Sequence, residues 1–240
     1  MVKILIPLAG PSAIDEDSQY LKSLREIKRK TVLQHVVDSL SKIENAEFIF
    51  VIRKEDVNKF HMDNVVKLMI PDSEIIIAES NTAGSACTCL LAIGKLNADE
   101  PLIISGSDQL VEWDLQSIVS EFEKFDAGTI VFDDVHPRWS YVKIDKDGYV
   151  IEAAEKNPIS RNATTGFFYF KKAKYFTEGV MNMIRKDASV NGAYYVCPAL
   201  NELVLNNLKI KTVMIPKENY FNFNSKTGIE MYTAYLKKSE

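Results

Sequence analysis

An acidic side chain follows a buried strand in the middle of the sequence. The stretch "PLIISGSDQ" (101–109) is an apolar run that ends in Ser-Gly-Ser and then presents Asp108. In open α/β sheets, ligands bind at the carboxyl ends of the strands. A carboxylate is also a hard oxygen ligand of the kind that Mg²⁺ takes in small numbers, with substrate phosphates supplying the rest. The pattern favours this role for Asp108 over that of a turn or helix-capping carboxylate, which suits Asp114 better.

Small residues begin a second stretch that could bind a ligand, "NTAGSACTCLLAIGKL" (81–96). Asn81, Thr82 and Gly84 lead into a predicted helix whose first turn is made of small side chains. The free amides of a helix N-terminus can bind an anion or the edge of a base, and small residues let a flat ligand approach the backbone. The same pattern fits a capped helix that packs tightly on a sheet, so both interpretations stay open.

A third stretch, "AAEKNPISRNATTGFFYF" (153–170), carries charges between two predicted strands. Glu155 and Lys156 end one strand, and Thr165 and Gly166 begin the next. A lysine at a strand end beside a cleft is a compact positive charge suited to a phosphomonoester. On an exposed sheet edge the same lysine would only oppose aggregation, and the spacing does not decide between the two.

Alternating strands and helices must position these residues. Apolar runs rich in Val, Ile and Phe alternate with helical patterns through the first half, which is typical of βαβ units and a mainly parallel sheet. The expected strands cover 2–8, 47–52, 74–78, 101–105 and 128–133, and the expected helices lie near 30–43, 55–62, 84–95 and 114–125. Beyond residue 133 we expect a hairpin in 140–156, strands in 164–172 and 209–215, and helices near 172–186, 198–206 and 226–238. The predicted class is α/β, in one compact domain whose second half is more mixed.

Charge and hydropathy argue against two classes of partner. The 240 residues carry a formal net charge of -4, with a pI near 5.6 and no basic stripe, which is unlike a nucleic-acid-binding protein. The longest apolar runs fall far below the roughly 20 residues that cross a bilayer, and the start of the sequence lacks a signal-peptide pattern. We therefore expect no nucleic-acid partner, no membrane insertion and a cytoplasmic location. The three cysteines are expected to be reduced, mostly buried thiols.

Seven short motifs occur in an order that is similar to that of one known family. They are a strand ending in "LAG", then "YLKSLREIKRKTVLQHVVDSL", "NTAGSACTCLLA", "SGSDQ", "AEKNP", "ATTGFFYF" and "FNFNSKTGIEMY". Together they resemble the nucleotidyltransferase family of sugar-phosphate nucleotidylyltransferases. The stretches "HPRWSYV" (136–142) and "NGAYYVCPALNEL" (191–203) resemble most the branch found with bacterial capsule and surface-polysaccharide genes.

The resemblance implies a Rossmann-like fold of the A-type glycosyltransferase kind, with nucleotide bound over 1–133 and sugar phosphate over 134–240. The implied reaction is attack of a phosphate oxygen on the α-phosphorus of a nucleoside triphosphate, with release of pyrophosphate and with Mg²⁺ as cofactor. Such a step requires mainly positioning and charge neutralisation. The implied partners are a nucleoside triphosphate and a small phosphorylated substrate for capsule or surface-polysaccharide synthesis, and a homodimer stays open.

Roles follow from the resemblance residue by residue. Lys22, Asp108 and Lys156 are the expected catalytic residues, and Asp108 with Asn222 is the expected metal pair. The expected nucleotide contacts are Leu8, Ala9, Gly10, Asn81, Gly84 and Ser107. The expected substrate contacts are Glu155, Thr165, Gly166, Trp139, Tyr195 and Asn201. For Trp139, a place in the core is an equal alternative.

The chain departs from the family pattern at two places. The family loop reads Gly-Gly-x-Gly-Thr-Arg, whereas here Gly10 is followed by Pro11, which has no amide donor, and then by Asp15, Glu16 and Asp17. The arginine that neutralises the triphosphate is absent. Near the end of the sequence, Asn222 stands where the family has a second metal-binding aspartate, so the site loses one negative charge and should hold Mg²⁺ less tightly.

Three accounts of function compete on this basis. In the first, the protein is a working nucleotidylyltransferase in which Lys22, Arg25 or Lys28 replaces the lost arginine. In the second, it uses the same fold to transfer something other than a nucleotide, such as a sugar from a nucleotide sugar. In the third, it is a non-catalytic subunit or sensor that binds a nucleotide or a sugar phosphate. We favour the first, because Lys22, Asp108 and Lys156 all persist.

Overall fold

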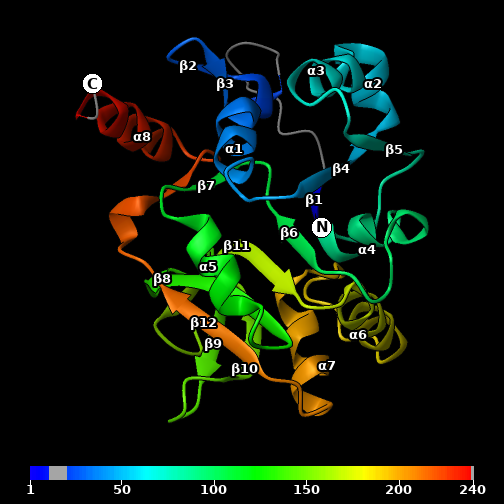
Figure 1. Cartoon of the computed structure of the whole chain (residues 1–240), viewed down its shortest axis with the longest axis vertical. Coiled ribbons are helices and arrows are strands. Elements are labelled where there is room, and N and C mark those ends of the chain that lie inside the picture. The colour runs from blue at the N-terminus through cyan, green and yellow to red at the C-terminus, as the bar shows by residue number, and fades with distance from the viewer. Residues whose placement is uncertain (11–20, 239–240) are drawn as a thin grey trace.

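The computed structural model describes residues 1–10 and 21–238 (Figure 1). Pro11 and the acidic residues Asp15, Glu16 and Asp17 of the predicted nucleotide loop lie outside the described residues. The principal sheet has the strand order β10-β9-β11-β6-β1-β4-β5, with β8 and β12 joined to it through β11. The α/β class expected from the alternating pattern is confirmed by this arrangement.

Four parallel strands form the first half of the sheet. In spatial order they are β6 (Leu102–Ser105), β1 (Val2–Leu8), β4 (Ala46–Arg53) and β5 (Glu74–Ala78). Ile4, Leu5 and Ile6 of the central β1 are fully buried, because helices cover both faces of a parallel sheet. A strand buried on both faces has a continuous apolar sequence, as β1 does. All four carboxyl ends therefore meet at one edge of the sheet.

The second half of the sheet is mostly antiparallel and is organised by β11 (Asn162–Phe170), which pairs with β6 on one side and β8 (Ala127–Asp133) on the other. Its register with β8 shifts between Thr164 and Phe168, and Gly166 within this bulge has φ 79°. The hairpin strands β9 (Ser140–Ile144) and β10 (Val150–Glu155) continue the sheet, and β12 (Ile210–Met214) runs parallel to β8.

Helices form a layer on each face of the sheet (Figure 1). One apolar cluster holds α1 (Val32–Leu40), α3 (Met62–Met69), α5 (Leu115–Phe122) and α8 (Lys226–Lys238). The opposite cluster holds α4 (Ser85–Leu90), α6 (Ala173–Arg185) and α7 (Leu200–Leu205). Thr31 caps α1 by accepting a hydrogen bond from the Gln34 amide at 3.1 Å.

The helix expected near 55–62 is α2 (Lys54–Phe60). It is separated from α3, which was not predicted, by His61, whose φ of 50° is left-handed. Two small sheets that pair β2 with β3 and β7 with β13 were not predicted either. The remaining short elements are β2 (Glu26–Ile27), β3 (Lys30–Thr31), β7 (Gln109–Val111), β13 (Tyr220–Asn222), and the 3-10 helices η1 (Lys22–Leu24), η2 (Ile93–Lys95), η3 (Cys197–Ala199) and η4 (Lys217–Asn219).

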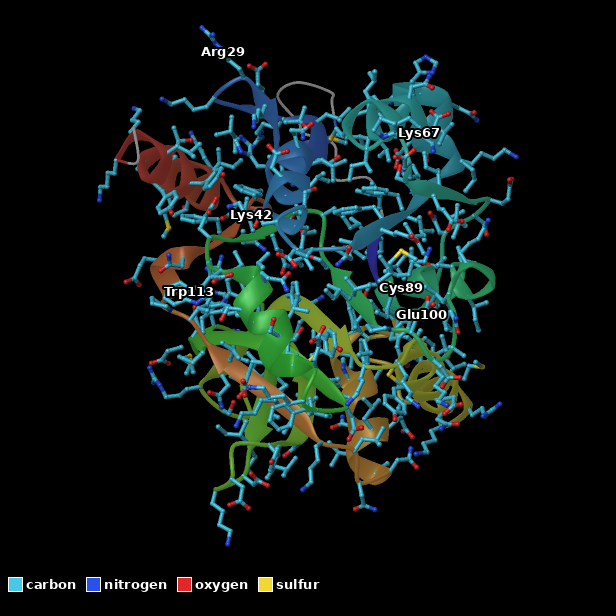
Figure 2. The ribbon with its side chains drawn as sticks, in the orientation of Figure 1. Arg29, Lys42, Lys67, Cys89, Glu100 and Trp113 are labelled. Atoms are coloured by element: carbon cyan, nitrogen blue, oxygen red, sulfur yellow. The ribbon has the colours of Figure 1, made fainter. Side chains whose placement is uncertain are left out.

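The cysteines carry free thiols, as expected. Cys89, labelled in Figure 2, and Cys197 are buried, and Cys87 is half-buried. Burial raises the pKa of all three thiols, so none is a ready thiolate at neutral pH. Within the described ranges, no helix is both long and apolar enough to span a bilayer.

Candidate active site

A cavity of about 450 Å³ opens where β1 and β6 end. Parallel strands deliver their carboxyl ends to one edge, so segments far apart in the sequence contribute neighbouring walls. On this side the walls come from the end of β1, from η1 and the start of α4, and from the loop after β6. Their residues include Leu8, Gly10, Lys22, Ser23, Ser85, Gly106, Ser107, Asp108 and Gln109.

The opposite wall of the same cavity is built by the antiparallel half. Its residues come from the start of β9, the end of β10, the bulge of β11 and the segment before α7. They include Ser140, Glu155, Gly166, Phe168, Tyr195 and Cys197. The predicted residues Leu8, Gly10, Lys22, Ser107, Asp108, Glu155, Gly166 and Tyr195 thus share one cavity.

Asp108 lies in a half-enclosed position on the cavity wall. Burial raises the pKa of its carboxyl above the usual range, while a hydrogen bond from the Asn224 side-chain amide and the positive charge of Lys22 act in the opposite direction. The backbone carbonyl of Asp108 accepts a hydrogen bond from the Phe223 amide at 2.8 Å. The loop after β6 is therefore held to the segment after β13 through both its backbone and its side chain.

Asn224, rather than the predicted Asn222, contacts Asp108 and lines the cavity. Asn222 lies in β13 opposite Gln109, and its Oδ1 accepts a hydrogen bond from the Asn224 amide at 3.0 Å. The alternation Phe-Asn-Phe-Asn (221–224) places both asparagines on one side of an extended chain, so the sequence could limit the partner of Asp108 to these two. The sequence does not predict the turn that brings Asn224, rather than Asn222, to Asp108.

The donors beside Asp108 suit a magnesium ion that is completed by its substrate. Mg²⁺ is commonly held by one or two protein ligands, with water and substrate phosphates filling the remaining positions. Asp108 offers a carboxylate. A half-turn of the Asn224 carboxamide exchanges the positions of its oxygen and nitrogen, so Asn224 can also offer an oxygen to the ion. Across residues 1–10 and 21–238, no group of three or more His, Cys, Asp or Glu residues could hold a metal on its own.

Glu155 and Lys156 occupy different places relative to the cavity. The Ser140 hydroxyl donates a hydrogen bond to the Glu155 carboxylate. Burial raises the pKa of Glu155, with the Ser140 hydrogen bond and the Lys156 charge opposing the rise. Lys156 is exposed and does not line the cavity, but it contacts Tyr195, which does. Its Nζ donates to the Tyr195 hydroxyl at 3.3 Å and lies 5.1 Å from the centre of the Tyr195 ring.

Three predicted substrate contacts have structural partners away from the cavity wall. Trp139 is 9% exposed, with its ring packed on Phe132 and Tyr220, so the core alternative describes its position. The Asn201 carboxamide exchanges two hydrogen bonds of 2.8 Å with the Ala153 backbone, and the Thr165 hydroxyl donates to the Ile130 carbonyl at 3.3 Å. Their polar groups bond to other parts of the protein, and none of the three lines the cavity where the sequence placed the substrate.

Three predicted nucleotide contacts also do not line the cavity. Ala9 is buried, and Asn81 is exposed outside the cavity. Gly84 has φ 112°, and a Cβ there would lie 2.3 Å from the Tyr194 carbonyl oxygen, so close packing explains this glycine. Its neighbour Ser85 reaches the cavity instead. The small-residue pattern located the segment but not the residue.

Gln109 is a cavity residue that sequence reasoning missed. Its side chain lies against Gly166, where an added Cβ would come within 2.1 Å of Oε1. This close approach accounts for a glycine in the bulge of β11. Among the described residues, Gln109 Oε1 is buried without a hydrogen-bond partner. Ser140 and Cys197 were also missed, because they belong to motifs whose placement depended on how β9 and β10 pair.

Comparisons with known proteins identify a family for this chain. Residues 18–196 match the model of a family described as nucleotidyl transferase. The bifunctional protein GlmU of Lactobacillus helveticus (strain DPC 4571) is 23% identical over 228 residues, which cover 90% of this chain and 47% of GlmU. The chain therefore spans about half the length of this curated relative.

Solved structures share the fold over nearly the whole chain. A nucleoside-diphosphate-sugar pyrophosphorylase from Vibrio cholerae RC9 superposes with a TM-score of 0.79 at 24% identity, covering 98% of this chain and 99% of that one. A UDP-glucose pyrophosphorylase complexed with UDP-glucose gives a TM-score of 0.77 at 17% identity, covering 98% of each chain. The Rossmann-like fold expected from the sequence is confirmed.

Proposed function

The chain belongs to the nucleotidyl transferase family, and on that premise we propose that it joins a nucleoside triphosphate to a phosphorylated sugar or a similar small phosphate. An oxygen of the acceptor phosphate attacks the α-phosphorus of the triphosphate. A new P–O bond forms while the bond to the β-phosphate bridging oxygen breaks, and pyrophosphate leaves. In this proposal the product is a nucleotide sugar or its equivalent for capsule or surface-polysaccharide synthesis.

One observation carries the proposal: Asp108 and Lys22 line the same cavity as Glu155. Phosphoryl and nucleotidyl transfer depend on positioning and on neutralising phosphate charge rather than on acid–base chemistry. Such a transfer uses a cationic side chain, here Lys22, and an oxygen ligand for a metal, here Asp108. It also uses a carboxylate that accepts hydrogen bonds from substrate hydroxyls, here Glu155. Their sharing one cavity supports a site for two substrates.

Each half of the cavity receives one substrate in this proposal. The nucleotide lies over the residues of 1–133, where Leu8, Gly10, Ser85 and Ser107 form the wall. The acceptor lies over the residues of 134–240, where Glu155 and Ser140 can bind its hydroxyl groups and Lys156, which contacts the lining residue Tyr195, attracts its phosphate. The chain then works as one domain with a nucleotide half and an acceptor half.

Lys22, Asp108 and Asn224 serve the triphosphate. The Lys22 ammonium neutralises phosphate charge, and Asp108 with Asn224 would hold Mg²⁺. When bound, the ion supplies positive charge that stabilises the leaving pyrophosphate. Asp108 must be ionised for this role, and the positive charge of Lys22 favours that form.

Pyrophosphate release tests the proposal. The protein is incubated with Mg²⁺, each of ATP, CTP, GTP, UTP and dTTP, and a panel that includes glucose 1-phosphate, N-acetylglucosamine 1-phosphate, inositol 1-phosphate and phosphocholine. Release that requires both a triphosphate and one acceptor supports it. No release with any pair, together with nucleotide-sugar hydrolysis or with binding alone, would contradict it in favour of sugar transfer or of a non-catalytic binding role.

A further inference from the structure

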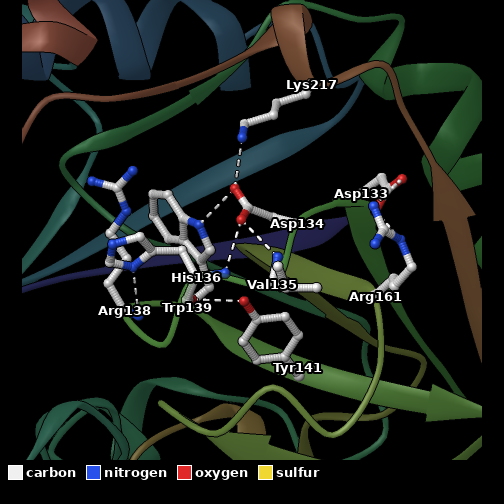
Figure 3. Close-up of polar contacts among 9 residues, drawn as sticks. All are labelled: Asp133, Asp134, Val135, His136, Arg138, Trp139, Tyr141, Arg161 and Lys217. Atoms are coloured by element: carbon white, nitrogen blue, oxygen red, sulfur yellow. Dashed lines mark hydrogen bonds and ion pairs between the residues drawn. The ribbon is translucent and has the colours of Figure 1, made fainter.

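The loop of residues 134–139, which joins β8 to β9, is organised around one carboxylate (Figure 3). Asp134 Oδ1 accepts hydrogen bonds from the backbone amides of Val135 and His136 at 2.7 and 2.9 Å. Asp134 Oδ2 accepts from the Trp139 indole at 3.1 Å and pairs with Lys217 Nζ at 2.8 Å. With a side chain only 9% exposed, Asp134 holds both ends of the loop and a distant lysine at once.

Aromatic packing fixes the same loop from inside the protein. The Trp139 ring meets Phe132 and Tyr220 edge-on, each with ring centres 5.6 Å apart. Phe132 and Tyr220 also stack on each other at 4.5 Å. The indole N–H that Asp134 accepts from would otherwise be a buried donor without a partner, so the carboxylate and the ring position each other.

The loop leads directly to the acceptor half of the cavity. The Trp139 carbonyl accepts a hydrogen bond from the Lys156 amide at 3.0 Å, and the next residue, Ser140, bonds to the Glu155 side chain. Lys156 has a left-handed φ of 54°, a conformation that a lysine keeps only when its surroundings impose it. Residues 139 and 140 thus set both the backbone of Lys156 and the side chain of Glu155.

Lys217 connects the loop to the metal side of the cavity. It begins η4, which continues into β13, and Tyr220 of β13 packs on the Trp139 ring. The chain that leaves β13 carries Asn224, which contacts Asp108. The Asp134–Lys217 pair therefore joins the loop of residues 134–139, whose end contacts Lys156, to the segment that leads through β13 to Asn224.

We infer that Asp134 is a positioning residue for the phosphorylated acceptor, acting through Trp139 and Ser140 on Lys156 and Glu155. It does not line the cavity itself. The inference rests on the proposed function and assigns a role to the "HPRW" stretch, which that function leaves unexplained. Loosening the loop should weaken acceptor binding while leaving triphosphate binding nearly unchanged.

The test compares Asp134→Asn with Asp133→Asn, the same chemical change at the neighbouring position. Among the described residues, the Asp133 side chain pairs with the exposed Arg161, whose Nε lies 2.8 Å from Asp133 Oδ1; both residues are drawn in Figure 3. In Asp134→Asn we expect the KM of the acceptor found by the pyrophosphate screen to rise about tenfold or more. The KM of the triphosphate should stay within about twofold in both variants, and Asp133→Asn should leave the acceptor KM at the wild-type value.

Amide hydrogen exchange supplies a readout that needs no substrate. Exchange at the Lys156 amide should be faster in Asp134→Asn than in the wild type or Asp133→Asn, because its acceptor on Trp139 is less firmly held. If Asp134→Asn does not fold, Lys217→Met serves instead, since that side chain is 56% exposed and its loss removes only one of the four contacts.

The outcomes are distinct. An unchanged acceptor KM in a folded Asp134→Asn variant, or an equal rise in the KM of both substrates, would overturn the inference. A wild type that releases no pyrophosphate with any pair would instead contradict the proposed function. In that case, unchanged Lys156 exchange in the variant would overturn the positioning role, and faster exchange limited to 139–156 would uphold it.

Discussion

The side-chain amide of Asn224 donates a hydrogen bond to the carboxylate of Asp108, joining the segment after β13 to the loop after β6. The two residues lie 116 positions apart in the sequence. Their contact places a second oxygen-bearing side chain beside the predicted metal ligand. If Asp108 binds Mg²⁺ as proposed, the second ligand is expected to be Asn224 rather than Asn222, which contacts the Asn224 backbone amide instead.

Replacing Asn224 by Asp should therefore strengthen Mg²⁺ binding. A second carboxylate beside Asp108 adds one negative charge to the donor set, and we expect the Mg²⁺ concentration that gives half-maximal pyrophosphate release to fall about tenfold, or about 1.4 kcal/mol. In the absence of Mg²⁺, the two carboxylates repel each other and the melting temperature should drop.

Asn222→Asp is the matched control for this change. In the wild type, Asn222 Oδ1 accepts a hydrogen bond from the backbone amide of Asn224. A carboxylate at position 222 can accept the same hydrogen bond, so the Mg²⁺ concentration for half-maximal release should not change. The opposite result would be a lower half-maximal Mg²⁺ concentration in Asn222→Asp and an unchanged one in Asn224→Asp. It would favour Asn222, the metal ligand expected from the sequence, over Asn224.

Removing the charge of Lys22 should weaken use of the triphosphate. Lys22 lines the cavity beside Asp108 and is half-buried. A hydrogen bond to a charged group contributes about 1.5–3 kcal/mol, so Lys22→Met should lower kcat/KM for the nucleoside triphosphate by about 10- to 100-fold. Steady-state kinetics with the acceptor saturated measures it. Lys30→Met, which removes an exposed lysine paired with Asp38, should match the wild type, and equal losses in both variants would argue against a specific role for Lys22.

Asp134 should make folding stability sensitive to acid. Burial alone would raise its pKa, but hydrogen bonds from Lys217, from the His136 and Val135 amides and from Trp139 lower it from 3.8 to about 2. Because the folded protein holds this proton less readily than the unfolded chain, the stabilisation is complete above pH 3.8 and is lost as the pH falls through about 2.

Chemical denaturation of Asp134→Asn across pH measures this contribution. The drop in pKa corresponds to about 2 kcal/mol, so the variant should unfold about 2 kcal/mol more easily than the wild type at pH 7. The difference should shrink between pH 4 and pH 2. A difference that stays constant over this range would show that the Asp134 charge is not what stabilises the loop.

The sequence predicted the parallel half of the fold well, because the information there is local. Val- and Ile-rich runs marked β1, β4, β5 and β6, and the alternation with helices implied a parallel sheet. Asp108 could be placed at the edge of the sheet since it follows a buried strand directly. Asp114 could be separated from it as a helix cap, and its carboxylate does accept from the Ser117 amide at 3.0 Å.

Features that depend on long-range contacts were not predictable in the same way. β7 and β13 have three residues each and pair across more than a hundred positions, so neither has a pattern of its own. Without that pairing, Asn224 could not be preferred over Asn222. The burial of Trp139 likewise depends on Phe132 and Tyr220, which approach it only in the folded chain.

In the proposed function, Asp108 lies at the reacting centre of the nucleotidyl transfer. The rate of pyrophosphate release by Asp108→Asn tests this role, beside Asp114→Asn as a control that keeps a capping side chain on α5. We expect Asp108→Asn to keep the wild-type melting temperature within a few degrees and to lose about a hundredfold or more in rate, while Asp114→Asn keeps full activity. Near-wild-type release by a folded Asp108→Asn protein would show that Asp108 does not lie at the reacting centre.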